Sequence, residues 1–243
     1  MTADATQPPL DGRKAMEVRF LPFKIAIAAS EQDLTDLIRL RSETYTRHNA
    51  PGADRLRTKE EQDGCADAVL LLARSKLDGT AVGSVRVQTR VRRSLMVEEA
   101  VRLPDEVASA TPIELMRGSI KNGTAGRMVS ASLAKATFLV CRQFGFSHVI
   151  VTCREPVDLM YRAYQFDELL SGEMVDLPYS PGAKHKVLCL PMSEATDRWR
   201  ARNRPLFQFM LETSHPDIQV DHAHIQRQLR RAAQAPELQT SPN

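Results

Sequence analysis

Several features that place a chain in a common functional class are missing from this sequence. Its four cysteines form no Cys-x-x-Cys pair and have no metal-ligand spacing, so we expect reduced, mostly buried thiols and no metal site. No apolar run approaches the ~20 residues that span a bilayer. The N-terminus lacks the basic-then-apolar order of a signal peptide. We therefore expect a cytoplasmic protein without integral membrane contact.

The chain also carries little net charge. A balance of +3 over 243 residues is too small to indicate a nucleic acid partner by itself, and we expect none. Basic residues nevertheless cluster at 90–93, 198–204 and 227–231. Each cluster is either a solvated surface or a site that attracts a nucleic acid, an anionic membrane or an acidic protein.

The residues that are present have the proportions of a globular protein, with 42% hydrophobic and 26% charged side chains. Their hydrophobic periodicity predicts an α/β fold of the mixed-sheet (α+β) kind, with helices on both faces. Strands are expected at 23–29, 68–73, 81–89, 111–120, 148–153 and 184–190, and helices at 30–48, 127–144 and 156–164.

The same patterns divide the chain into four parts. Residues 1–17 are polar and are expected to be a disordered tail, and residues 18–192 form the main domain. Residues 193–233 are expected to be a helical extension, with helices at 194–211 and 221–233. A second disordered tail is expected at 234–243. We find no internal repeat.

Charged residues occur at positions that are expected to face the interior. Glu114 and Arg117 lie within an apolar strand, Arg86 lies on the preceding strand, and Arg41 interrupts the apolar stripe of the first helix. Burying a lone charge costs several kcal/mol or more, so such residues are usually paired or functional. They form either an internal ion-pair network or a reactive cleft.

The spacing of Glu114 and Arg117 adds a geometric condition. Strict alternation along a strand places residues that are three positions apart on opposite faces. If both side chains reach one cleft, the strand must contain a β-bulge. We therefore predict a bulge in this strand.

These residues match the pattern of a known family. The order of elements resembles the GNAT acyltransferase fold, followed here by the helical extension. Arg41 with Tyr45, then acidic residues (Asp63, Asp67), Arg86, and Glu114-x-x-Arg117 are similar to the motifs of acyl-homoserine-lactone synthases of the LuxI type. The same framework occurs in N-acyl amino acid synthases of the FeeM type. The resemblance covers about residues 18–192.

Two departures favour the second branch. The lactone-synthase pattern has a tryptophan soon after the aromatic residue of the first helix, whereas the single tryptophan here is Trp199. The phosphate loop of CoA-dependent GNAT enzymes is reduced to Arg-Met-Val-Ser-Ala-Ser at 127–132, without the glycines that let a pyrophosphate approach the backbone.

The resemblance therefore implies an N-acyltransferase that moves a long acyl chain from acyl carrier protein to the amine of an amino acid. The donor is a phosphopantetheine thioester (acyl-ACP, or acyl-CoA), and no tightly bound cofactor is implied. A lactone synthase or a CoA-dependent N-acetyltransferase is the alternative enzyme. A non-catalytic acyl- or pantetheine-binding module is the alternative outside catalysis. The sequence leaves the acceptor, the chain length and the oligomeric state open.

Roles for the charged residues follow from the chemistry of acyl transfer. Glu114 is expected to accept the amine proton or to bind the ammonium group, with a pKa that burial raises and nearby arginines lower. Arg86 and Arg117 are expected to hold either a substrate carboxylate or acidic side chains. Arg41 is expected to pair with Asp63 or Asp67.

Further residues are assigned by the resemblance. Backbone N–H groups near Met116 and Gly118 would face the oxyanion, and Tyr45 would contact substrate. Tyr164 would protonate the departing thiolate, unless it only packs in the core. The residues expected to bind the pantetheine phosphate lie at the start of the second long helix: Arg127, Met128, Ser130 and Ser132.

Overall fold

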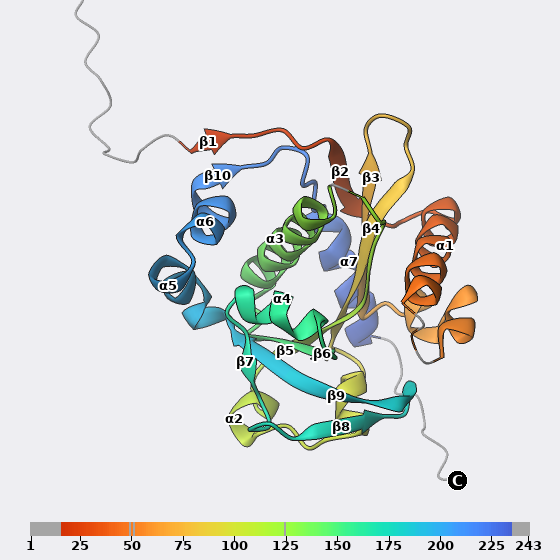
Figure 1. Ribbon diagram of the computed structural model, residues 1–243, viewed down its shortest axis with the longest axis vertical. Coiled ribbons are helices and arrows are strands. Elements are labelled where there is room, and N and C mark those ends of the chain that lie inside the picture. The colour runs from red at the N-terminus through yellow and green to blue at the C-terminus, as the bar shows by residue number, and fades with distance from the viewer. Residues whose placement is uncertain (1–15, 49, 51, 124, 235–243) are drawn as a thin grey trace, which may run out of the picture.

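The computed structural model describes residues 16–48, 50, 52–123 and 125–234. Its main sheet has the strand order β2-β3-β4-β5-β6-β9-β7, with β8 paired to β9 (Figure 1). The strands are β2 (Phe23–Ile27), β3 (Ala68–Ser75), β4 (Ala81–Thr89), β5 (Pro112–Ile120), β6 (His148–Cys153), β7 (Asp167–Glu168), β8 (Met174–Leu177) and β9 (Ser180–Pro191).

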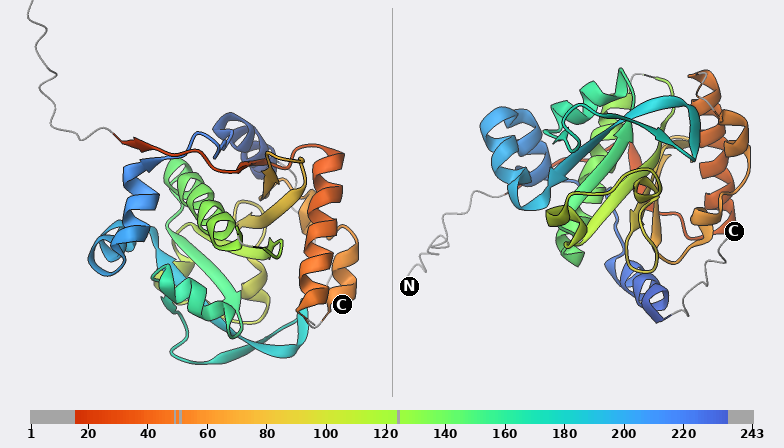
Figure 2. Two further views of the ribbon diagram at one scale, coloured as in Figure 1. Left: turned by 45° about the horizontal axis from the view of Figure 1, so that its top comes forward. Right: turned by 90° about the horizontal axis from the view of Figure 1, so that it is seen from below.

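Helices cover both faces of this sheet (Figure 2). The main helices are α1 (Glu31–Arg47), α2 (Asp105–Ala108), α3 (Gly126–Phe144), α4 (Val157–Ala163), α5 (Met192–Arg202), α6 (Arg204–Phe207) and α7 (His222–Gln234). Short 3-10 turns are η1 (Ala53–Arg57), η2 (Glu61–Gly64) and η3 (Met96–Glu99). The predicted mixed α/β fold is confirmed.

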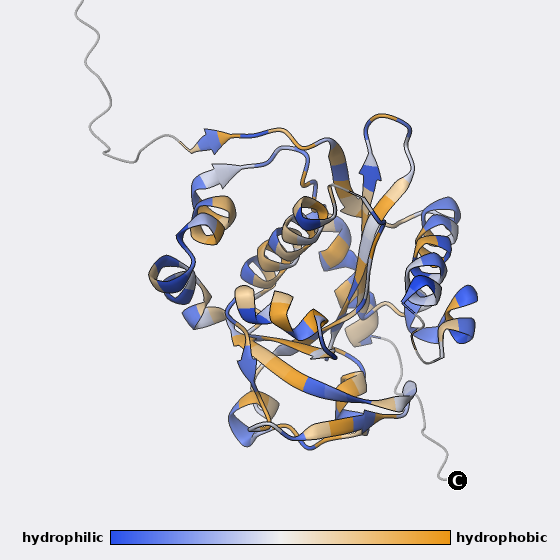
Figure 3. Ribbon diagram, viewed as in Figure 1, coloured by the Kyte–Doolittle hydropathy of each residue, from blue (hydrophilic) through white to orange (hydrophobic). Residues whose placement is uncertain are grey.

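Successive side chains of β4 point to opposite faces of the sheet, and a different helix packs on each face. Val85 and Val87 belong to the same core cluster as Val129 and Leu133 of α3. The residues between them, such as Arg86, face the opposite side, where α1 contacts β4 and β5. Apolar residues are concentrated on the strands, whereas α1 and α5 consist largely of hydrophilic residues (Figure 3). The charged residues of β4 therefore face α1.

Local signals in the sequence position α1 and α3. Ser30 and Asp33 form a reciprocal capping box that starts α1. Gly145 ends α3 in the left-handed conformation, at φ 68°, which a residue without Cβ adopts at little cost.

Strands β5 and β6 are parallel neighbours for only part of their length. They pair from Pro112 with His148 to Leu115 with Val151, and no further. Beyond Leu115 the edge of β5 that faces β6 has no strand partner. This divergence leaves a gap in the centre of the sheet.

The predicted bulge in β5 is present next to this gap. Arg86 pairs with Met116 and Ser84 pairs with Ser119, so three residue steps on β5 oppose two on β4. Arg117 adopts φ 55°, which is uncommon for a residue with a side chain. The bulge turns Arg117 toward the face that carries Arg86.

The region near β8 differs from the sequence prediction. The last strand begins at Ser180 instead of 184, and β8 forms a hairpin with it. The segment was not recognised because its exposed and buried residues alternate over only four positions (Met174–Leu177) and three of the four are apolar, so the sequence alone shows no alternation. The β8–β9 hairpin lies on the same side of the sheet as α1 (Figure 2).

The C-terminal residues also differ in detail. The helix expected at 194–211 is interrupted at Asn203, whose side chain caps the following turn at the Leu206 N–H. Pro205 cannot supply a helical hydrogen bond, so α5 and α6 are separate helices. A π-helical turn (Gln208–Glu212) follows.

The extension is joined to the main domain by β pairing and by core packing. β10 (Thr213–Ser214) pairs in parallel with β1 (Glu17–Val18), so residue 17, the last of the first predicted tail, lies in a strand. The rest of the first predicted tail, residues 1–15, lies outside the described residues, as does 235–243 of the second. Within the described parts of the chain, no helix has the length and apolarity needed to cross a membrane.

Candidate active site

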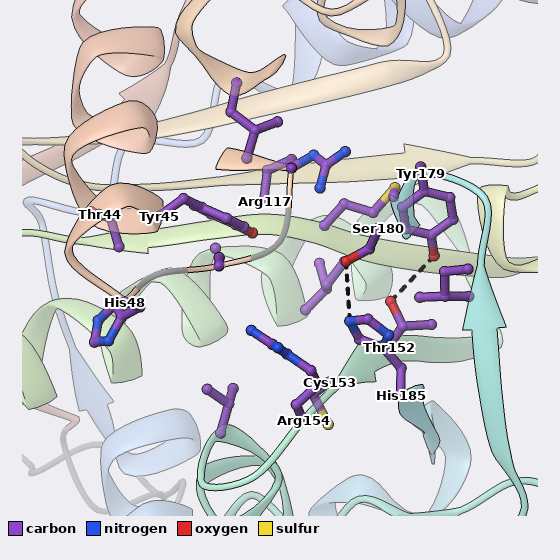
Figure 4. A pocket seen from close by; sticks show the side chains of 18 of the residues that line it. Thr44, Tyr45, His48, Arg117, Thr152, Cys153, Arg154, Tyr179, Ser180 and His185 are labelled. Atoms are coloured by element: carbon purple, nitrogen blue, oxygen red, sulfur yellow. Dashed lines mark hydrogen bonds between the residues drawn. The ribbon is translucent and has the colours of Figure 1, made fainter. Parts of the chain in front are cut away.

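A cavity of about 470 Å³ opens where β5 and β6 diverge. Its wall combines the end of α1, the loop through η1 and η2, both diverging strands, and the β8–β9 hairpin (Figure 4). Tyr45 and Thr44 line it from α1, Leu115 to Gly118 from β5, and Thr152 and Cys153 from β6, with Arg154 directly after that strand.

A buried cluster of charges supports one side of this cavity. Both carboxylate oxygens of Asp63 accept hydrogen bonds from Arg41, at 2.7 and 3.0 Å, and Arg86 donates to the same carboxylate at 3.0 Å. Arg117 donates two hydrogen bonds to the carboxylate of Glu60, at 2.8 and 2.6 Å. Arg41 and Arg86 each add a bond to Glu60 at 3.1 Å. These arginines therefore converge on two carboxylates.

The cluster keeps both carboxylates ionised. Burial alone would raise the pKa of Glu60, but the hydrogen bond from Arg117 and the charges of the surrounding guanidinium groups lower it further than burial raises it. The pKa of Asp63 is lowered in the same way, mainly by Arg41. Arg41 thus pairs with Asp63, as one of its two predicted partners. The other, Asp67, lies 3.8 Å from Arg93 instead.

Glu60 was not recognised in the sequence. It lies in a polar loop with other charged residues and breaks no apolar pattern. The available signal was its spacing from Asp63, because the two residues form a capping box around η2. That local motif fixes both carboxylates on one turn and presents them to the arginines.

Glu114 lies in a different environment from Glu60. It is fully buried, accepts hydrogen bonds from the Val97 N–H at 3.0 Å and the Tyr179 hydroxyl at 3.1 Å, and does not line the cavity. Burial raises its pKa to about 7, against the opposing effects of these donors and of Arg86. The carboxyl group can therefore exchange a proton near neutral pH.

Tyr179 connects Glu114 with the cavity. Its hydroxyl donates to Glu114 and lies 3.3 Å from the hydroxyl of Thr152, and both Tyr179 and Thr152 line the cavity (Figure 4). The guanidinium of Arg117 lies 5.7 Å from the centre of the Tyr179 ring. Glu114 and Arg117 therefore both contact Tyr179, Glu114 at its hydroxyl and Arg117 at its ring. Only Arg117 of the two lines the cavity.

The bulge also places backbone groups beside the cavity. Met116 and Gly118 line it, on the edge of β5 that β6 leaves unpaired. No atom comes within 4 Å of where a Cβ on Gly118 would lie, so the strand is accessible there. Backbone N–H groups at such an edge can meet an oxyanion.

The residues expected at the thiolate and phosphate lie outside the cavity lining. The Tyr164 hydroxyl is 3.2 Å from the Ser130 hydroxyl, and Tyr161, not Tyr164, lines the cavity. Arg127, Met128, Ser130 and Ser132 occupy the first two turns of α3, and none of them lines the cavity. Ser132 is fully buried, whereas Met128 is exposed.

The geometry does not support a nucleophilic cysteine or a metal site. Cys153 lines the cavity, but burial raises the pKa of its thiol to about 12, so it stays protonated. Among the residues that the structure describes, no group of His, Cys, Asp and Glu side chains is arranged to hold a metal ion.

Comparison with known proteins identifies related sequences and folds. The family model described as "N-acyl amino acid synthase FeeM" matches residues 36–184. The structure of FeeM, an N-acyl amino acid synthase from uncultured soil microbes, aligns with a TM-score of 0.58 and 13% identity, over 72% of this chain and 93% of that one. No curated protein matches the sequence.

Two acyl-homoserine lactone synthases share the fold as well. BjaI, described as CoA-dependent, aligns with a TM-score of 0.55 and 16% identity over 88% of this chain and 100% of its own. LasI aligns with a TM-score of 0.54 and 14% identity over 71% of this chain and 93% of its own. The expected GNAT-like acyltransferase fold is thereby confirmed.

Proposed function

The chain belongs to the FeeM family of N-acyl amino acid synthases and is an N-acyltransferase; from this premise we propose that it moves a long acyl chain from acyl carrier protein to the amine of an amino acid. The observation that carries the proposal is the position of Glu114, a carboxyl group with a pKa of about 7 that the Tyr179 hydroxyl links to the cavity. Amine acylation needs such a proton acceptor, because alkyl amines are mostly protonated at neutral pH.

The donor thioester would lie along the free edge of β5. β5 and β6 pair no further than Leu115, so the edge of Met116 to Gly118 that faces β6 has no strand partner, and these residues line the cavity. An N–H group on this edge would donate to the thioester oxygen as it gains negative charge. The Glu60–arginine cluster would hold the bulge in position, since Arg117 is part of both.

The reaction would proceed with a balanced transfer of protons. The ammonium group of the acceptor loses one proton to the Tyr179 oxygen while Tyr179 passes its own proton to Glu114. The neutral nitrogen attacks the thioester carbon, the oxygen becomes an oxyanion, and its collapse breaks the carbon–sulfur bond. The second proton of the nitrogen then passes to the departing thiolate and neutralises it.

A carrier protein is our proposed source of the acyl chain. The first turn of α3 lacks the glycines of a CoA phosphate loop, so it does not favour a nucleotide pyrophosphate. Exposed apolar side chains occur at Met128 on α3 and at Val157 and Leu159 on α4. Val157 also lines the cavity, which places an apolar surface at its rim.

The basic cluster at 198–204 is less available to a carrier protein than its sequence suggests. Arg198 pairs with Glu194 and Asp167, Arg200 pairs with Asp197, and Arg204 pairs with Glu212. Its positive charge is therefore largely balanced locally.

A donor comparison tests the proposal. The purified protein would receive one amino acid and the same long acyl chain as a thioester of either acyl carrier protein or CoA. We expect a higher kcat/KM with the carrier-protein thioester. If the CoA thioester is consumed equally fast or faster, the carrier-protein donor is refuted. The acyl donor is then acyl-CoA, as for BjaI, which is described as CoA-dependent.

A further inference from the structure

We propose that the guanidinium of Arg154, together with the imidazole of His185, binds the carboxylate of the acceptor amino acid. This inference rests on the proposed function and identifies the group that would make the enzyme select amino acids over simple amines. It assigns a role to two cavity residues that the charged motifs of the sequence do not include.

The charge balance of the cavity wall first points to Arg154. The lining carboxylates are Glu60 and Glu155, and both have partners: Glu60 is held by Arg117, and Glu155 accepts from Lys186 at 3.1 Å. Arg117 is therefore not free to bind a substrate anion without giving up Glu60. Arg55 and Arg154 also line the cavity and have no charged or hydrogen-bonded side-chain partner among the described residues.

Position distinguishes these two arginines. Arg55 is exposed on η1, whereas Arg154 is half-buried directly after β6, at the strand that diverges from β5. Figure 4 shows the Arg154 side chain extending into the cavity, toward the side formed by α1. A half-buried, unpaired guanidinium favours an anion there, because planar guanidinium groups bind carboxylates through two parallel hydrogen bonds.

His185 supplies a second, independent observation. Only 7% of the residue is exposed, it lines the same cavity, and its Nδ1 has no hydrogen-bond partner of normal geometry. Its Nε2 lies 3.4 Å from the Ser180 hydroxyl. A buried ring nitrogen without a partner is costly unless a ligand satisfies it.

The two side chains act on one another electrostatically. Burial lowers the pKa of His185, the Ala183 carbonyl opposes this effect, and the positive charges of Arg154 and Arg117 lower the pKa further. The imidazole is therefore neutral at neutral pH and donates one N–H group without adding charge. An anion in the cavity within reach of both side chains would gain one charged and one neutral donor.

The chemistry of the substrates favours the acceptor carboxylate over a phosphate of the donor. The amine and carboxylate of an α-amino acid are attached to the same carbon, so both must fit in the cavity where acyl transfer occurs. The phosphate of a phosphopantetheine arm is separated from its thioester by the length of the arm. An anion site within the cavity wall therefore suits the acceptor.

Acceptor pairs that differ only in the carboxylate test the inference. Initial rates would be measured with an amino acid and with its amide, using a hexadecanoyl thioester of acyl carrier protein and either wild type or Arg154→Gln. We expect the KM for the amino acid to rise about 10- to 100-fold in the variant, since hydrogen bonds to charged groups have this effect. The KM for the amide and for the donor should not change. His185→Phe should raise the same KM by a smaller factor.

Matched variants make the outcome decisive. Arg102→Gln removes a paired, exposed arginine outside the site and should leave every constant unchanged. The inference fails if Arg154→Gln raises only the donor KM, if the amide is affected as much as the amino acid, or if Arg55→Gln shows the effect instead. If wild type acylates no amino acid, the proposed function itself fails, which is a distinct result. Thermal unfolding of each variant verifies that it is folded.

Discussion

Two glutamates near the same strand show how environment assigns different roles to one type of side chain. Glu60 is surrounded by arginines that lower its pKa against the effect of burial, so it is ionised at neutral pH and holds Arg117 in place. Glu114 is buried with only neutral hydrogen-bond donors beside it, and its pKa rises to about 7. Pairs of carboxyl groups whose pKa values are moved apart commonly divide structural and acid–base tasks.

The titration of Glu114 should be visible in stability. Its pKa rises from 4.5 to about 7 on folding, so the folded state holds the proton more tightly than the unfolded chain. The corresponding stability is present at low pH and is lost as pH rises through about 7. Relative to Glu114→Gln, wild type should lose about 3 kcal/mol between about pH 4 and pH 8. Urea unfolding of both proteins at each pH measures this difference; a constant difference would contradict the buried carboxyl group.

The ion cluster predicts a large mutational effect at Asp63. Its side chain is fully buried against Arg41, so Asp63→Asn leaves buried guanidinium charge uncompensated and should cost about 3–5 kcal/mol of unfolding free energy. The control is Asp54→Asn, because Asp54 also pairs with an arginine but is 90% exposed. That change should stay within about 0.5 kcal/mol. Similar losses for the two variants in urea unfolding would refute the distinction.

The sequence predicted some of these residues because they broke a pattern. Glu114 and Arg86 stand out as charges within apolar strands, and Arg41 interrupts an apolar helix stripe. Glu60, Arg154 and Tyr179 occur in segments that are already polar or irregular, where no periodicity marks them. Their convergence depends on how loops pack, which a single sequence does not encode locally.

At the scale of elements, the bulge in β5 is the feature that brings the site together. It turns Arg117 toward Glu60 and leaves Met116 and Gly118 beside the gap. The bulge was predictable because Glu114 and Arg117 could not otherwise face one site. The β8–β9 hairpin was not, although it supplies both Tyr179 and His185 to the cavity wall.

The conformation of Arg117 can be tested apart from its charge. Arg117→Asn and Arg117→Val both remove the guanidinium, but asparagine tolerates a positive φ whereas a β-branched residue does not. The valine variant should therefore be less stable than the asparagine variant by about 1–2 kcal/mol. Chemical denaturation provides the comparison. Equal stability would show that the bulge is not strained at this position.

At the scale of the whole molecule, the C-terminal extension completes the core. Trp199 is 2% exposed, packs edge-on against Phe138 of α3, and donates from its indole N–H to the Tyr164 carbonyl at 2.9 Å. Lys135 of α3 donates to the carbonyls of Phe209 and Thr213 in the extension. The extension therefore supports the elements that flank the site, rather than forming a separate appendage.

Truncation of Trp199 should accordingly destabilise the entire fold. Trp199→Ala should cost about 3–5 kcal/mol, the usual effect of removing a large buried aromatic side chain. Leu77→Ala is the control, since Leu77 is 94% exposed and should change stability by less than about 0.5 kcal/mol. One cooperative unfolding transition in both proteins would agree with a shared core. A Trp199 variant of native stability would contradict it.

Mass spectrometry of lipid extracts tests the central claim most directly. Cells that overproduce the wild-type protein would be compared with cells that overproduce Glu114→Gln at the same level. The account predicts an N-acyl amino acid in the wild-type extract and a strong decrease of it in the variant. An N-acyl-homoserine lactone, or no new acylated amine despite folded protein, would contradict the account.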